Sequence, residues 1–137
     1  MNGRKRHLLV DSQGLVLGVH ITGAEVSDEH GGMDLLRKAS PSYPRLETGW
    51  ADGAYRGLFA PYAWHIHGIL VEKSIQRNER VHAVTSKRWV VERTFAWLGR
   101  YRRLSKDYEY LCQTTETWIY LAMSYLLVKR LGRIRAF

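Results

Sequence analysis

The chain opens with two apolar runs separated by a short polar segment. Residues 7–21 (HLLVDSQGLVLGVHI) hold both runs, joined by the polar residues 11–14. Aspartate, serine and glycine suit a tight turn and the flanks favour strands, so the segment predicts a β-hairpin. Residues 28–39 begin with the capping candidate Asp28 and continue with apolar residues at helical spacing. They predict a short helix, which two internal glycines would weaken.

Further along, the pattern predicts a strand, a helix, a strand and two helices, at residues 45–51, 58–67, 69–72, 86–103 and 116–131. The last of these is the clearest amphipathic helix, with an apolar face formed by Trp118, Ile119, Ala122, Tyr125, Leu126 and Val128. Gly132 is expected to end it, leaving a basic tail. Strands that alternate with helices predict a single α/β or α+β domain over residues 1–137.

The charge of the chain is distributed unevenly. Residues 1–72 hold 7 Lys/Arg and 8 Asp/Glu, whereas residues 73–137 hold 14 Lys/Arg and 5 Asp/Glu, within a net charge of +8. A strongly basic half indicates a polyanionic partner, most often nucleic acid. One cysteine, no long apolar run and no secretory signal pattern are consistent with a cytoplasmic protein without a membrane partner.

Asp52 is the first candidate for chemistry. It follows the strand predicted at residues 45–51 and precedes a loop that contains glycine. Polar residues at the carboxyl end of a strand often face the functional crevice of an α/β sheet. Asp before Gly is also a common turn pair, in which the carboxylate bonds its own backbone, and position alone favours this second interpretation.

Glu92 is the second candidate. It is the only acid between Lys87 and Lys106, a segment with seven basic residues, and Arg88 precedes it by one helical turn. An ion pair with Arg88 is the commoner role for such a carboxylate. The alternative is a metal ligand that the surrounding positive charge keeps ionised.

Considered together, Asp52 and Glu92 are stronger candidates for metal ligands than either is alone. Two carboxylates brought together by a fold repel each other unless a divalent cation bridges them. Mg²⁺ or Mn²⁺ at such a site can activate a water or a 3′ hydroxyl for displacement at phosphate. The candidates for contacts with DNA phosphates are the basic residues around Glu92, namely Lys87, Arg88, Arg93, Arg100, Arg102, Arg103 and Lys106.

Three segments of the chain resemble DDE transposases of the insertion-sequence-five group, within the insertion-sequence-four superfamily. They are GRKRHLLVDSQGLVLGV, WADGAYRG and KRWVVERTFAWLGRYRRLSKDYEYL. The resemblance implies a ribonuclease-H-like fold, a mixed five-stranded sheet flanked by helices. It also implies Mg²⁺-dependent cleavage and strand transfer at the ends of a mobile element, with DNA ends and target DNA as partners.

Carried over residue by residue, the resemblance implies that Asp52 is the second catalytic acid and Glu92 the third. Arg88 matches the arginine that the family places one turn before the glutamate. The family's lysine about two turns after the glutamate falls on Gly99 here, with Arg100 next to it.

The first catalytic acid of the family lies on a strand upstream of the segment with which this chain begins. Asp11 falls in the predicted turn, where the family often has an aspartate that is not catalytic. We therefore expect a catalytic domain without its first strand and its first acid. An upstream transposase fragment or a homo-oligomer would then complete it, because unpaired sheet edges tend to capture a partner strand.

Two functions from different classes remain open at this point. The first is a DNA transposase, incomplete in this chain. The second is a catalytically inactive DNA-binding fragment that modulates a full-length enzyme. Removing Asp52 or Glu92 should abolish the first function and leave the second intact or strengthened, because a carboxylate near phosphate opposes binding.

Overall fold

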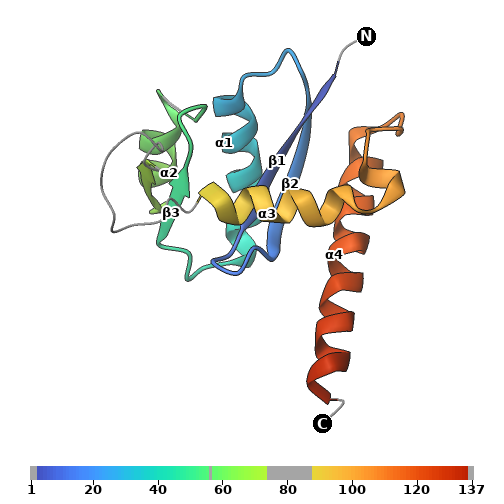
Figure 1. Ribbon diagram of the computed structural model, residues 1–137. Helices are drawn as coiled ribbons and strands as arrows, with labels where there is room; N and C mark the ends of the chain where they lie inside the picture. The colour runs from blue at the N-terminus through green and yellow to red at the C-terminus, as the bar shows by residue number, and fades with distance from the viewer. Residues whose placement is uncertain (1–2, 56, 74–87, 136–137) are drawn as a thin grey trace, which may run out of the picture.

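The computed structural model describes residues 3–55, 57–73 and 88–135. Over these residues the chain is a mixed α/β structure of two small sheets and four α-helices (Figure 1). The elements are β1 (Arg4–Val10), β2 (Val16–Gly23), α1 (Asp28–Ala39), β3 (Thr48–Ala51), α2 (Phe59–His67), β4 (Leu70–Lys73), α3 (Arg88–Gly99) and α4 (Cys112–Arg135). Two short 3-10 helices, Ser40–Ser42 and Arg102–Leu104, lie in the connections.

The predicted hairpin is present, because β1 and β2 pair antiparallel. Asp11 organises the turn through its Oδ1 atom, which accepts hydrogen bonds from the backbone N–H groups of Gln13 and Leu15, both at 2.9 Å. Gly14 has a φ of 85°, a conformation that glycine adopts without steric cost. The turn chemistry seen in the sequence therefore fixes this hairpin.

Helix α1 matches its predicted range, but its cap differs. The cap is Ser27, whose Oγ accepts the backbone N–H of His30 at 3.2 Å, and Asp28 is the first helical residue. The prediction that Asp28 caps the helix was wrong by one position. Its carboxylate still stabilises the helix, because negative charge is favourable in the first turn.

Residues 48–73 lead from β3 through α2 to β4. Strands β3 and β4 pair parallel, with Thr48 opposite Leu70, and a parallel pair needs a crossover of this kind. The predicted strands and helix are all present, although β3 is shorter than the range predicted at residues 45–51.

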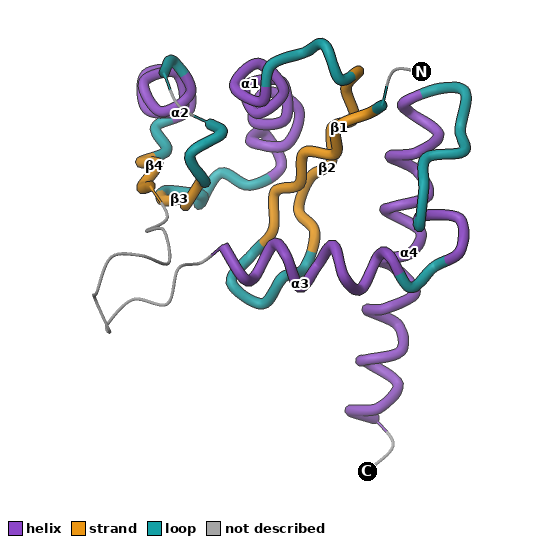
Figure 2. Tube along the Cα trace, turned by 45° about the horizontal axis from the view of Figure 1, so that its top comes forward, coloured by secondary structure: helices purple, strands orange, loops and turns teal. Residues whose placement is uncertain are grey.

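The strands form two separate sheets, β1–β2 and β3–β4, whereas the family resemblance implies one mixed sheet, from which we expected the first strand to be missing. Figure 2 shows the two pairs apart, with α1 and α2 on one side and α3 on the other. The physical reason is that no described strand lies between β1 and β3, so neither backbone edge has a partner to continue the ladder.

The two C-terminal helices differ from their predicted bounds. Helix α3 ends at Gly99, and residues 100–103, predicted as helix, form a turn and a short 3-10 helix. Helix α4 runs through Gly132 to Arg135, so the prediction that Gly132 ends it was wrong. On α4 the side chains of Ile119 and Ala122 are buried.

Three side chains assigned to the apolar face of α4 are exposed, namely those of Trp118, Tyr125 and Val128. Tyr125 and Val128 are exposed because they lie on the C-terminal half of α4, which extends beyond the body of the molecule (Figure 1). Trp118 lies in the N-terminal half, where the guanidinium carbon of Arg103 is 5.2 Å from its ring centroid. None of the described helices combines the length and apolar character needed to cross a membrane.

Helix α4 also covers the outer edge of β2. The backbone N–H of Val19 donates to the Tyr120 hydroxyl at 3.1 Å, and that of Ile21 donates to Glu116 Oε1 at 3.0 Å. Behind this edge, Val19 and Ile21 pack in a core cluster with Leu98, Leu104, Ile119 and Ala122. A second cluster under α1 and α2 contains Leu36, Phe59, Ala63 and Ile69.

Candidate active site

A cavity of about 640 Å³ lies between the two sheets. We call it the inter-sheet cavity. Its walls are residues 4–9 of β1, residues 49–52 at the end of β3, the inner face of α1, and Val91, Glu92 and Phe95 of α3. Asp52 and Glu92, the two carboxylates predicted from the sequence, both line it.

Asp52 follows β3 directly and begins a tight turn. Its Oδ1 accepts the backbone N–H of Ala54 at 2.9 Å, and its carbonyl oxygen accepts that of Tyr55 at 3.2 Å. This is the turn geometry anticipated for an aspartate before a glycine. The turn engages Oδ1, and the carboxylate still lies on the wall of the inter-sheet cavity.

Glu92 reaches the same cavity from α3. Val90 and Thr94 are buried and hold this part of the helix against the body, whereas the Glu92 side chain is exposed. The predicted ion pair with Arg88 involves a side chain outside the described residues. Packing of α3 therefore brings Glu92 to a cavity that it shares with Asp52.

Asp28 is a third carboxylate on this wall, and sequence reasoning gave it no weight. It lies in the first turn of α1, and its Oδ1 is 3.3 Å from Lys5 Nζ. Only the packing of α1 against β1 reveals this position. Among the described residues, no three acidic, histidine or cysteine side chains are arranged to hold a metal ion.

Asp11, which the family resemblance assigns to a turn and not to the catalytic acids, is not part of the cavity wall. Its Oδ1 accepts two backbone N–H groups of the hairpin turn. The structure thus keeps it in the role of a turn residue.

A buried chain of hydrogen bonds connects the Asp52 turn to the hairpin. The Tyr55 hydroxyl lies 3.0 Å from His7 Nδ1, and His7 Nε2 lies 3.0 Å from the Thr22 hydroxyl. Burial, followed by the charges of Asp28 and Asp52, raises the pKa of Tyr55 to about 12. Tyr55 therefore stays protonated, and its hydroxyl remains a donor in this chain of hydrogen bonds. His7, in the middle of the hydrogen-bond chain, is 1% exposed.

The predicted DNA-binding cations fall into separate environments. Arg93 Nη2 donates to the Gln13 carbonyl oxygen at 2.6 Å, and Arg103 Nε donates to Glu109 Oε1 at 2.5 Å. Arg100, Arg102 and Lys106 are exposed near the end of α3. Lys87 lies outside the described residues, as does the side chain of Arg88.

Comparison with known proteins gives two matches. A sequence profile of the family described as "Transposase DDE domain" matches residues 1–127. A Burkholderia cepacia protein named "Putative transposase for insertion sequence element IS402" is 32% identical over 114 residues, which are 78% of this chain and 54% of that protein. The chain thus spans about half the length of this relative. No solved structure gives a significant match.

Proposed function

Since this chain belongs to the transposase DDE domain family, we propose that it is part of an enzyme that cuts and joins DNA at the ends of an insertion sequence. One observation carries the proposal: Asp52 and Glu92, far apart in the sequence, line a single cavity. The basic half of the chain provides positive charge for the DNA phosphates. The three segments quoted above support membership of the insertion-sequence-five group.

The two carboxylates suit a hard divalent cation. Mg²⁺ takes one or two protein carboxylates and keeps several waters, so Asp52 and Glu92 would hold it, and Mn²⁺ would bind in its place. When bound, the ion would supply activation of a nucleophile and stabilisation of the leaving oxygen at phosphate. The protein's part is positional: the turn after β3 fixes Asp52 and the packed face of α3 carries Glu92.

We further propose that the complete fold is ribonuclease-H-like, with one more strand between β1 and β3. Two features support this. The inter-sheet cavity is lined by residues of both strands, and α4 already covers the outer edge of β2. The strand, and the first catalytic acid with it, would come from polypeptide outside these residues, in the same protein or in an upstream transposase fragment.

The second candidate is a DNA-binding fragment without catalysis. The observation that favours it is the lack, among the described residues, of a three-ligand metal cluster. The two candidates differ in metal binding, and this difference provides the test.

The test is thermal unfolding of the purified chain with and without Mn²⁺. A cation that binds only the folded state stabilises it by about 2.7 kcal/mol at one hundred times its dissociation constant. We expect Mn²⁺ to raise the unfolding midpoint of the wild type, and to leave Asp52→Asn and Glu92→Gln unchanged. Asn keeps an oxygen that can accept the Ala54 N–H, so the turn is preserved.

Glu47→Gln is the matched control, because Glu47 is exposed and is not part of the cavity wall. Its midpoint should rise with Mn²⁺ as in the wild type. An equal rise in the Asp52→Asn/Glu92→Gln double variant would place the metal elsewhere and contradict the proposal. A wild type that does not respond would favour the binding fragment.

A further inference from the structure

A second cavity, of about 420 Å³, lies between the end of α3 and the C-terminal half of α4. Four cations line it, namely Arg100, Lys129, Arg130 and Arg133, together with the aromatic residues Trp97, Tyr101 and Tyr125 and the apolar residues Leu98, Met123 and Leu126. We call it the basic groove. No aspartate or glutamate is part of its lining.

The fold assembles this charge from distant parts of the sequence. Lys129, Arg130 and Arg133 follow one another on α4 at spacings that keep them close on the helix surface, and Arg100 comes from the turn after α3. Buried Leu98 and Met123 lie beneath them. The groove therefore exists only because α3 packs against α4.

Aromatic rings hold two of the cations in place. The guanidinium carbon of Arg130 lies 4.8 Å from the Trp97 ring centroid, and that of Arg93 lies at the same distance. Lys129 Nζ lies 5.3 Å from the Tyr125 ring centroid. Because the Trp97 indole already contacts two guanidinium groups, it has little free face on which a base could stack.

Within the part of the chain that the structure describes, none of the four groove cations forms an ion pair with an aspartate or a glutamate. Like charges gathered without counter-charges raise the local potential by several kT and attract a polyanion.

We propose that the basic groove binds the phosphodiester backbone of nucleic acid through charge, without reading base sequence. That the polyanion is DNA rests on the proposed function, whereas the groove itself follows from the packing of α3 and α4. The site is separate from the inter-sheet cavity, and α3 connects the two: Glu92 lines one cavity, and Arg100 follows the helix end in the other.

This connection sets a distance. Arg100 follows Glu92 by eight residues, which is about 12 Å along a helix at 1.5 Å per residue. This length corresponds to about three to four base pairs of duplex at 3.4 Å each. If one strand of a duplex lay at Asp52 and Glu92, phosphates of the same duplex within about half a helical turn would therefore reach the groove.

The test is the affinity of the full chain for a fluorescently labelled duplex of arbitrary sequence and for its single strand, by anisotropy without divalent cations. The variant is Lys129→Gln/Arg133→Gln, which leaves Arg130 on Trp97. Each neutralised phosphate contributes about 0.9 to the slope of log affinity against log salt. We expect the variant to lose about tenfold in affinity at low salt and to have a slope shallower by about 1.8.

Arg37→Gln/Arg45→Gln is the control, because it removes the same charge from two exposed side chains on other elements. Equal losses in both double variants, or a wild type that binds neither DNA, would overturn the groove as a binding site. A loss confined to the single strand would overturn the assignment to phosphate alone.

Asp52→Asn/Glu92→Gln distinguishes this proposal from the previous one. It should bind DNA at least as tightly as the wild type, because a carboxylate near phosphate opposes binding, while it loses the response to Mn²⁺. If the groove variant binds DNA like its control while Mn²⁺ still stabilises the wild type through Asp52, the groove proposal fails and the transposase proposal stands.

Discussion

At the scale of single residues, the two glycines of α1 matter because of what they contact. A Cβ on Gly31 would lie 2.2 Å from His7 Nε2, and a Cβ on Gly32 would lie 2.8 Å from Tyr55 Cδ1. Both neighbours belong to the buried hydrogen-bond chain beside the Asp52 turn. Glycines that seemed to weaken a helix in the sequence are the residues that let the helix approach this chain.

Gly31→Ala should therefore lower the free energy of unfolding by about 1–3 kcal/mol, the usual cost of overpacking a rigid interior. The His7 ring cannot give way without losing hydrogen bonds at both nitrogens. Urea unfolding would measure the change.

Gly132→Ala is the matched comparison, because an added Cβ there meets no atom within 4 Å and the position is inside α4. It should stabilise the protein by about 0.5–1 kcal/mol, the gain of alanine over glycine in a helix. A Gly31→Ala protein as stable as Gly132→Ala would show that α1 does not depend on this close approach.

At the scale of elements, the sequence predicts those whose signals are local. The hairpin follows from Asp11 and Gly14, which lie between two apolar runs. Helix α1 follows from polar residues that precede apolar residues at helical spacing. The division of the sheet and the length of α4 have no local signal. Both depend on which distant segments pack together.

The cover that α4 places over β2 is one such distant contact. Glu116 accepts the Ile21 N–H at 3.0 Å and two contacts of 3.1 Å from Lys38 Nζ. Glu116→Ala should lower the free energy of unfolding by about 1.5–3 kcal/mol, because a charged acceptor is lost from a largely buried position.

Glu116→Gln should lower the free energy of unfolding by a smaller amount. Its amide oxygen can still accept the Ile21 N–H, although the negative charge is gone. Thermal and urea unfolding of the three proteins would rank them as wild type, Gln, Ala. If the alanine variant matched the wild type, the Glu116 carboxylate would add nothing to the stability of this edge.

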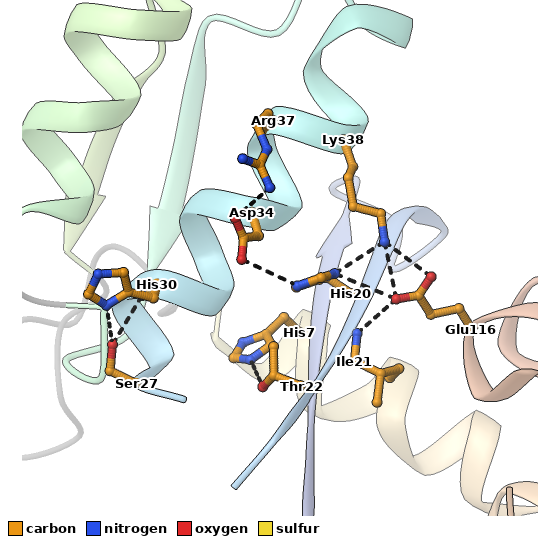
Figure 3. A network of polar contacts seen from close by, with 10 residues as sticks. All are labelled: His7, His20, Ile21, Thr22, Ser27, His30, Asp34, Arg37, Lys38 and Glu116. Carbon is orange, nitrogen blue, oxygen red and sulfur yellow. Dashed lines mark hydrogen bonds and ion pairs between the residues drawn. The ribbon is translucent and has the colours of Figure 1, made fainter. Parts of the chain in front are cut away.

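At the scale of the whole molecule, a polar network joins the hairpin to α1 and α4 (Figure 3). His20 of β2 lies 3.6 Å from Asp34 Oδ2, 3.5 Å from Glu116 Oε1 and 3.1 Å from Lys38 Nζ. Burial, and then the Lys38 ammonium, lower the pKa of His20, although Glu116 and Asp34 oppose this.

The nearby His7 also has a lowered pKa, mainly through burial and against the opposing charge of Asp28. Both rings are therefore favoured as neutral in the folded state, and the unfolded state takes up protons first as the pH falls. Their contribution to stability is complete above about pH 6.5 and is lost as the pH falls below it.

Urea unfolding across this range should show the free energy of unfolding decreasing towards acid. His20→Gln should give a shallower slope, because one of the two titrating groups is gone. Stability that rises on acidification would contradict this account of the network.

Asp107 affects stability over a lower pH range than the two histidines. Burial alone would raise the pKa of its carboxyl group, but hydrogen bonds from the Glu109 N–H and the Thr115 hydroxyl, together with the nearby Arg4, lower it.

The candidate sites differ in how far the sequence predicts them. Asp52 and Glu92 are visible in the sequence as an acid at a strand end and a lone acid in a basic helix, and in the structure both line the inter-sheet cavity. The wall position of Asp28 has no sequence signal. Of the four groove cations, only Arg100 was predicted from the sequence to contact DNA. Lys129 and Arg130 lie at the end of the predicted helix and Arg133 lies in the predicted basic tail, and the groove forms only when α3 packs beside them.

The contacts between the hairpin and α4 also have a consequence for the order of synthesis. Val19 and Tyr120 are separated by 101 residues, and Ile21 and Glu116 by 95. The ribosome therefore makes the hairpin long before the helix that covers it. Until α4 emerges, the nascent chain carries an open strand edge that other chains can pair with, and a message that ends early releases the protein in that form.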